Sequence, residues 1–131
     1  MSNSNDKLTA ASIRYLLALG ELDRDETGVK SSDIAQRLGI TKPSVHTMIK
    51  RFAQKGYVTK AKYEAVHLTS DGRRLSEQYK KCFDLIYASV QTSLNLPAED
   101  GQNAACAVLA ETDICGLESL YLKLCGAKAA V

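Results

Sequence analysis

The chain has 131 residues, with 17 lysines and arginines against 15 aspartates and glutamates and a net charge of +2. That length is enough for one small core or for a binding domain with an assembly module, and the ordinary apolar and charged fractions argue against general disorder. No apolar run approaches the roughly 20 residues that span a bilayer, and the first residues lack the basic and apolar regions of a secretory signal, which predicts a cytoplasmic protein without a membrane span.

Two helices are predicted in the first third of the chain. Leucine and isoleucine recur at helical spacing over residues 8–22, which predicts the first helix, and a charged loop follows over residues 20–28. The polar residues 31–33 offer N-cap chemistry for a short second helix, which Gly39 ends.

A third helix, over residues 41–54, is predicted to have two distinct faces. Thr41 can cap it, and Pro43 is tolerated in its first turn because no intrahelical N–H is needed there. Its apolar side chains at i, i+4 and i+7 form one buried stripe: Val45, Ile49 and Phe52. The opposite face carries polar and basic side chains: Lys42, Ser44, His46, Thr47, Lys50 and Arg51.

A hairpin follows this helix. Residues 57–60 and 65–69 alternate between apolar and polar side chains, which predicts two short strands with a turn at residues 62–64. Helix, turn, helix and hairpin is the element order of a winged helix-turn-helix, here built from residues 31–69.

The rest of the chain is predicted to be helical. A long helical pattern runs from residues 70–72 to about residue 95, Pro97 breaks it, and two further helices follow over residues 98–111 and 113–123. The predicted fold is therefore mainly α. An N-terminal winged helix-turn-helix DNA-binding domain over residues 1–72 is followed by an α-helical dimerisation or sensing domain over residues 73–131.

The charge is unevenly distributed along the chain. Residues 42–81 hold 10 basic and 3 acidic side chains, a net charge of +7, whereas residues 82–131 hold 2 basic and 6 acidic ones, a net charge of −4. This division predicts that the basic stretch binds a polyanion and that the acidic stretch has a different task. The alternative is that the basic stretch forms a face exposed to solvent that binds no polyanion.

The exposed face of the third helix suits binding to double-stranded DNA. Basic side chains can neutralise phosphates, and short polar side chains near the start of the helix can meet base edges in the major groove. The candidate DNA-binding residues are Lys42, Pro43, Ser44, His46, Thr47, Lys50 and Arg51 on the helix, and Lys60, Lys62 and Tyr63 in the wing. His46 as a merely solvated side chain and Tyr63 as a packing residue of the hairpin remain open alternatives.

The sequence favours two other function classes less. The apolar stripe of the C-terminal helices would also suit a winged-helix protein-interaction module, although the basic stretch argues against it. An enzyme is not expected, because the sequence has no glycine-rich phosphate loop, no nucleophile elbow and no acid/base pair.

Five short motifs follow one another in the DNA-binding part: Ser32-Asp33-Ile34-Ala35, Pro43-Ser44-Val45, Met48-Ile49-Lys50-Arg51, Lys55-Gly56-Tyr57-Val58 and Leu68-Thr69-Ser70-Asp71-Gly72. Together they resemble the metal-dependent repressors of the diphtheria-toxin repressor and manganese-transport regulator family. The resemblance implies a homodimer that represses transcription from a palindromic operator, dimerisation through the helices after Pro97, and a divalent metal, manganese or iron, as cofactor.

The resemblance also implies where that metal would bind, between the first helix, the long helix after the wing and the next helix. Ala11 and Arg14 stand at first-helix positions where the family has Met, Asp or Glu ligands, and Cys82 stands where the long helix gives a His. Cys106 stands where the next helix gives Glu or Cys, and Leu109 with Ala110 replaces its Glu-His pair. Methyl and guanidinium groups do not coordinate a metal, so most of the family's ligands are lost.

Two thiols remain at the former ligand positions. One hypothesis is that Cys82 and Cys106 form a metal, thiol-modification or disulfide site, which would make the protein a thiol- or redox-responsive regulator. The alternative is that both are small buried hydrophobic residues in a metal-independent regulator.

Overall fold

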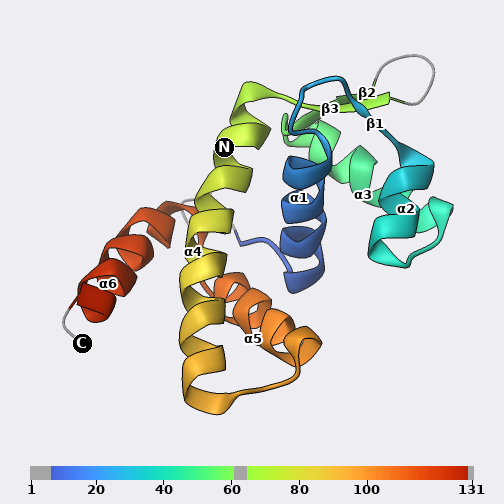
Figure 1. Ribbon diagram of the computed structural model, residues 1–131. Coiled ribbons are helices and arrows are strands. Elements are labelled where there is room, and N and C mark those ends of the chain that lie inside the picture. The colour runs from blue at the N-terminus through green and yellow to red at the C-terminus, as the bar shows by residue number, and fades with distance from the viewer. Residues whose placement is uncertain (1–6, 61–64, 130–131) are drawn as a thin grey trace. The chain divides into compact units, whose positions relative to one another are not determined.

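The computed structural model describes residues 7–60 and 65–129 (Figure 1). Its contacts divide the chain into two compact units, one of residues 15–77 and one of residues 7–14 with 78–129. The domain boundary expected between residues 72 and 73 lies within a helix, α4 (Ser70–Leu94), and stays a prediction.

The unit of residues 15–77 is the winged helix-turn-helix. It contains, in chain order, most of α1 (Ala10–Leu22), then β1 (Val29–Lys30), α2 (Ser31–Leu38), α3 (Lys42–Gln54), β2 (Val58–Lys60), β3 (Ala65–Leu68) and the start of α4. Helices α2 and α3 contact each other, and each contacts the strand next to it in the chain (Figure 1). The predicted fold of this part is confirmed.

The predicted ends of α3 are confirmed by its caps. Thr41 Oγ1 accepts a hydrogen bond from the backbone N–H of Ser44 at 3.3 Å, and Pro43 lies in the first turn. The turn before α3 and the loop after it both need a left-handed backbone, which glycine adopts without strain: φ is +66° at Gly39 and +81° at Gly56.

The start of α2 differs from the prediction. The helix begins at Ser31, and its N-cap residue is Lys30, which makes no side-chain cap hydrogen bond. The cap predicted among residues 31–33 is therefore wrong. The reason is a strand that the sequence pattern missed: Val29 and Lys30 form β1, so the chain passes directly from a strand into the helix, and Ser31 is buried.

The sheet has three antiparallel strands in the order β1-β3-β2. Val66 of β3 lies opposite Val29 of β1 and Lys60 of β2, so β3 is the central strand. The apolar residues buried in this unit come from every element: Leu16, Ala18, Leu19, Val29, Ile34, Val45, Met48, Ile49, Phe52, Val58, Val66 and Leu75. The helices and the wing thus share one core.

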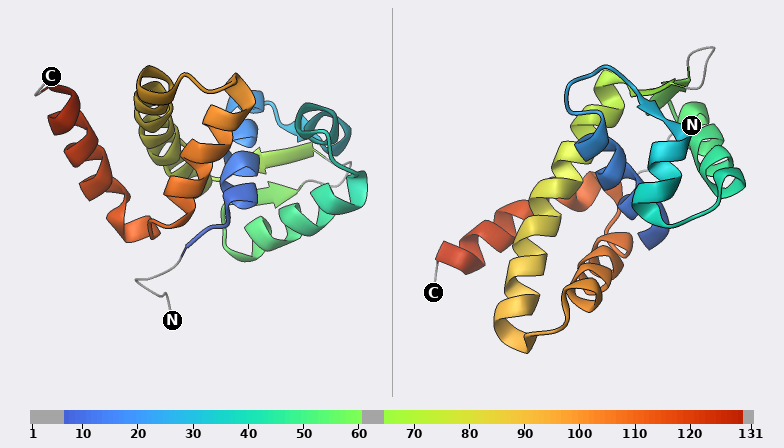
Figure 2. Two further views of the ribbon diagram at one scale, coloured as in Figure 1. Left: turned by 90° about the horizontal axis from the view of Figure 1, so that it is seen from below. Right: turned by 45° about the vertical axis from the view of Figure 1, so that its right-hand side comes forward.

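The second unit consists of helices (Figure 2). After the remainder of α4 come α5 (Ala98–Ala110), the 3₁₀ turn η1 (Ile114–Gly116) and α6 (Leu117–Ala129). The helix predicted over residues 113–123 is wrong in its bounds, because the Asp113 side chain accepts from Gly116 N at 2.8 Å and closes a separate turn before α6 begins. No helix in the described part of the chain is both long and apolar enough to cross a membrane.

Candidate nucleic-acid interface

One face of α3 is held by the core and the other is exposed. Val45, Met48, Ile49 and Phe52 are at most 5% exposed, which fixes the helix about its long axis. All seven residues of α3 that the sequence predicted to bind DNA are exposed: Lys42, Pro43, Ser44, His46, Thr47, Lys50 and Arg51. Their accessibility agrees with the predicted interface, and contact with DNA itself stays a prediction.

Short hydroxyl side chains gather at the N-terminal end of α3. Thr41 Oγ1 donates to Ser44 Oγ at 3.0 Å, and Thr47 Oγ1 donates to the carbonyl of Pro43 at 3.1 Å. No acidic residue lies in the first turn. The helix dipole and the charge of Lys42 therefore make this end of the helix electropositive, which favours a phosphate or a base edge with acceptors.

The basic residues of α3 extend this surface toward the end of the helix. Lys50 and Arg51 are exposed and form no ion pair with an acidic residue in the part of the chain that the structure describes. Their charges are thus available for phosphates. Lys60 at the end of β2 is also exposed, whereas the other two predicted wing residues, Lys62 and Tyr63, lie outside the described residues.

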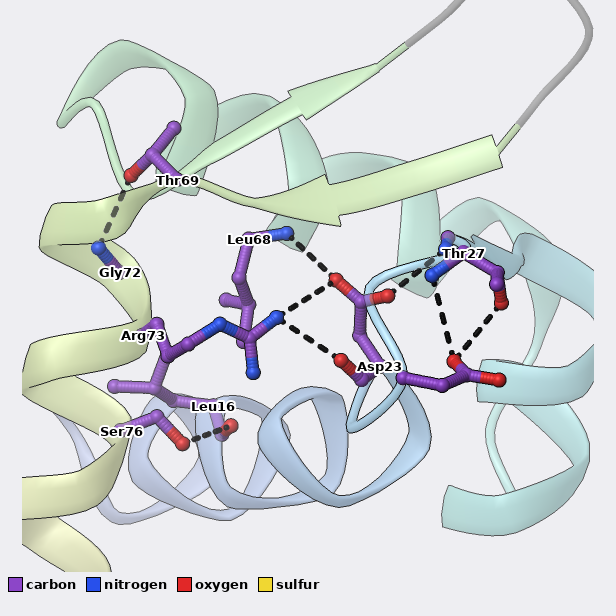
Figure 3. Close-up of polar contacts among 10 residues, drawn as sticks. Leu16, Asp23, Thr27, Leu68, Thr69, Gly72, Arg73 and Ser76 are labelled. Atoms are coloured by element: carbon purple, nitrogen blue, oxygen red, sulfur yellow. Dashed lines mark hydrogen bonds and ion pairs between the residues drawn. The ribbon is translucent and has the colours of Figure 1, made fainter.

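A buried carboxylate connects β3 of the wing to the end of α1 and the start of α4 (Figure 3). Asp23, 1% exposed, accepts from the backbone N–H of Gly28 at 2.8 Å through Oδ1 and from that of Leu68 at 3.1 Å through Oδ2. Arg73 of α4 donates to Asp23 Oδ2 at 3.3 Å and to the Asp23 carbonyl at 2.9 Å. In the sequence pattern Asp23 is one of several charged residues of a predicted loop, and nothing there indicated this role.

A second connection joins the end of α3 to the start of α4. Thr69 Oγ1 donates to the carbonyl of Gly56 at 2.6 Å and accepts from the backbone N–H of Gly72 at 3.0 Å. The backbone N–H of Thr69 donates to the carbonyl of Tyr57 at 3.0 Å. These bonds connect the end of β3 to the residues that follow α3, and the Asp23 network connects β3 to the end of α1 and the start of α4.

The two predicted thiol ligands have different neighbours. Cys82 of α4 is buried, and its Sγ donates to the carbonyl of Leu117 at 3.6 Å. Burial raises the pKa of the Cys82 thiol, nearby Cys125 adds to that rise, and Lys81 opposes it. Burial also raises the pKa of the Cys106 thiol on α5, where the guanidinium of Arg14 lies beside it and lowers it in part.

These surroundings do not fit a manganese or iron ion. Both metals favour oxygen and nitrogen ligands, whereas the group beside Cys106 is a cation. No cluster of three or more His, Cys, Asp or Glu side chains that could hold a metal occurs in the part of the chain that the structure describes. A site that uses the two thiols of Cys82 and Cys106 alone stays a prediction.

Comparison with known proteins supports the resemblance seen in the motifs. Residues 7–66 match the family described as iron dependent repressor, N-terminal DNA binding domain. The transcriptional regulator MntR of Escherichia coli O6:H1 is 28% identical over 72 residues, which cover 55% of this chain and 46% of the relative. MntR of Salmonella typhimurium is 26% identical over the same length. The match thus spans about half the length of these curated relatives.

Solved structures extend the likeness to nearly the whole chain. A hypothetical protein from Sulfolobus solfataricus superposes with a TM-score of 0.63 at 22% identity, covering 89% of each chain. The manganese regulator SloR superposes with a TM-score of 0.70 at 23% identity, covering 86% of this chain and 53% of its own. ScaR with bound Zn²⁺ gives a TM-score of 0.62 at 23% identity. At these identities the likeness concerns the fold.

Proposed function

Because residues 7–66 of this chain belong to the family of iron dependent repressor N-terminal DNA-binding domains, we propose that the protein is a DNA-binding transcription regulator, and specifically a repressor. The recognition helix is α3, which enters the major groove with its N-terminal residues toward the bases. The wing, with Lys60 at the end of β2, contacts the phosphate backbone beside it. This function accounts for an exposed polar face on a helix that is otherwise buried.

The observation that carries the proposal is the division of α3 into two faces. The buried face holds the helix rigidly, and every candidate DNA-contacting side chain on the other face is exposed. The stretch from residue 42 to residue 81 adds a net charge of +7. A rigid helix with short polar groups at its start and cations around it is what sequence-dependent binding to a duplex requires.

We propose further that two copies of the chain bind a palindromic operator. Three large apolar side chains in the second unit are strongly exposed: Leu94, Val108 and Leu122, at 63%, 45% and 62%. Val108 of α5 and Leu122 of α6 belong to the helices after Pro97, through which the family resemblance implies dimerisation. A two-fold dimer would present two recognition helices to half-sites about one helical turn of DNA apart.

Selection from a pool of random duplexes, followed by fluorescence anisotropy, tests this function. The expected result is a preferred palindromic sequence whose affinity falls steeply with salt and survives an excess of heparin. Equal binding to all duplexes, with complete displacement by heparin, would contradict sequence-specific regulation. Light scattering of the free protein and of the complex measures the number of chains per operator, and a single chain would contradict the dimer.

A further inference from the structure

A basic side chain of α1 contacts the face of α5 that carries one of the predicted metal-ligand positions. Arg14 Nη2 donates a hydrogen bond to Asn103 Oδ1. The same guanidinium lies beside the buried thiol of Cys106, three residues further along α5. Residues three apart share one face of a helix, so a single cation contacts two neighbouring side chains of α5.

This cation lies between two of the helices where the family resemblance implies a divalent metal. A metal ion there would be a positive charge bonded to both helices, present only when the metal is available. The guanidinium of Arg14 is charged at every physiological pH and presents several donors in one plane. It provides a permanent positive charge between α1 and α5, and it repels a second cation from the same place.

The thiols do not restore a metal site around it. Cys106 faces the guanidinium, and the Cys82 thiol is engaged by the carbonyl of Leu117 at the start of α6. Among the residues that the structure describes, no third acidic, histidine or cysteine side chain completes a cluster with them. Between α1 and α5 the structure therefore has a hydrogen bond from Arg14 to Asn103 in place of a set of metal ligands.

We infer that Arg14 takes the place of a bound metal ion as the positive charge that ties α1 to α5, so that this chain binds its operator without a divalent metal. The inference rests on the proposed DNA-binding function and specifies its regulation. In this protein, DNA binding is independent of manganese and iron concentration.

The experiment compares metal-free and metal-loaded protein. The full chain is stripped with EDTA under reducing conditions, its residual metal is measured by mass spectrometry, and operator affinity is measured with EDTA or with excess manganese, iron or zinc. The expected dissociation constants agree within about twofold, because no ion distinguishes the two states. An affinity at least tenfold weaker in EDTA and restored by any of these ions would overturn the inference.

A second measurement needs no DNA. A ligand that binds only the folded chain raises its unfolding midpoint, by an amount that grows with the logarithm of its concentration relative to its dissociation constant. The expected result is that manganese, iron and zinc leave the urea midpoint unchanged and that calorimetry detects no saturable binding. A raised midpoint with one ion bound per chain would overturn the inference even if the protein bound no operator. Failure of the inference can therefore be distinguished from failure of the proposed DNA-binding function.

Substitutions test the residue itself. Arg14→Gln removes the charge and keeps a polar side chain, and its matched control is Lys7→Gln, which removes one exposed positive charge from the same unit. Loss of one such contact is expected to weaken operator binding by about twofold to tenfold in Arg14→Gln, with Arg14→Lys intermediate and Lys7→Gln unchanged. If Arg14→Gln and Lys7→Gln weaken operator binding equally, Arg14 contributes only a general positive charge. That result would overturn its assignment as the cation that joins α1 to α5.

Discussion

Asp23 and Arg73 form a buried ion pair, with 3.3 Å between Oδ2 and Nη2, that joins the end of α1 to the first turns of α4. The side chain of Asp23 is 1% exposed and that of Arg73 25% exposed. Because Asp23 also accepts from two backbone N–H groups, its carboxylate satisfies three donors that water reaches poorly. Removing one partner of a buried ion pair is costly, because the other charge is left buried without a counter-charge.

Replacing Asp23 is therefore expected to destabilise the winged-helix unit strongly. Asp23→Ala leaves the Arg73 guanidinium and two backbone donors without their acceptor, which should cost about 3–5 kcal/mol. Asp23→Asn keeps one acceptor oxygen and should cost less. Urea unfolding followed by circular dichroism measures both. The matched control is Asp25→Asn, whose exposed carboxylate accepts from the backbone and the hydroxyl of neighbouring Thr27. An equal loss of stability in that variant would contradict the role of Asp23.

Gly72 marks a close approach of α4 to the wing. A Cβ at this position would lie 2.0 Å from the carbonyl oxygen of Tyr57, which is backbone and cannot turn away. Gly72→Ala should therefore cost about 1–3 kcal/mol of unfolding free energy through overpacking. The matched change is Gly126→Ala within α6, where a Cβ meets nothing within 4 Å and should stabilise its helix by up to about 1 kcal/mol. A harmless Gly72→Ala would contradict the contact.

The recognition helix could be predicted from the sequence because its determinants are local. Thr41, Pro43 and Gly56 mark the ends of α3, and the spacing of Val45, Ile49 and Phe52 determines which face is buried. The remaining side chains then face outward by helix geometry alone. The exposed candidate residues of this helix followed directly from that pattern.

The elements that hold the wing could not be predicted in the same way. Strand β1 has only two residues, too few for an alternating pattern, and it exists because it pairs with β3 more than 30 residues later. Asp23 resembles its charged neighbours in sequence, since burial of a carboxylate depends on donors that other segments bring to it. An aspartate directly after a helix occurs too often in proteins for that position alone to identify a buried carboxylate such as Asp23.

The contacts in the region of the implied metal site could also not be predicted from the sequence. The motif resemblance indicates that Arg14 and Cys106 stand where proteins of that family have ligands. It gave no sign that the guanidinium would bond to Asn103 of α5. That contact depends on the packing of helices nearly ninety residues apart in the chain.

The four cysteines should differ sharply in reactivity. Burial raises the pKa of the Cys82 and Cys106 thiols, so at pH 8 each carries less thiolate than an ordinary thiol, and access to them is also blocked. Cys115 is exposed and should react first with a disulfide reagent. Mass spectrometry of timed labelling measures the order, and Cys115→Ser should remove the fast phase. Rapid labelling of Cys82 in the folded chain would contradict its burial.

Arg51 should act on affinity rather than on sequence preference. Its exposed guanidinium lies toward the end of α3, where a phosphate contact is the expected role. Arg51→Ala should weaken binding to all duplexes alike and reduce the slope of log affinity against log salt by about 1. Lys123→Ala, a loss of charge on α6, is the matched control and should leave the slope unchanged. An Arg51→Ala variant with an unchanged slope would contradict a phosphate contact.

Thr47 should act on sequence preference instead. Thr47 lies on the exposed side of α3, and its hydroxyl donates to the carbonyl of Pro43. In the proposed complex its methyl group contacts the methyl of a thymine. Thr47→Ser removes that methyl and keeps the hydroxyl bond, so it should alter preference at one base pair of each half-site by about 1–3 kcal/mol while the salt slope stays as in the parent chain. Selection repeated with Thr47→Ser and with Thr92→Ser, a matched change of an exposed threonine on α4, separates the two positions. If both variants select the parent operator, α3 does not contact bases through Thr47.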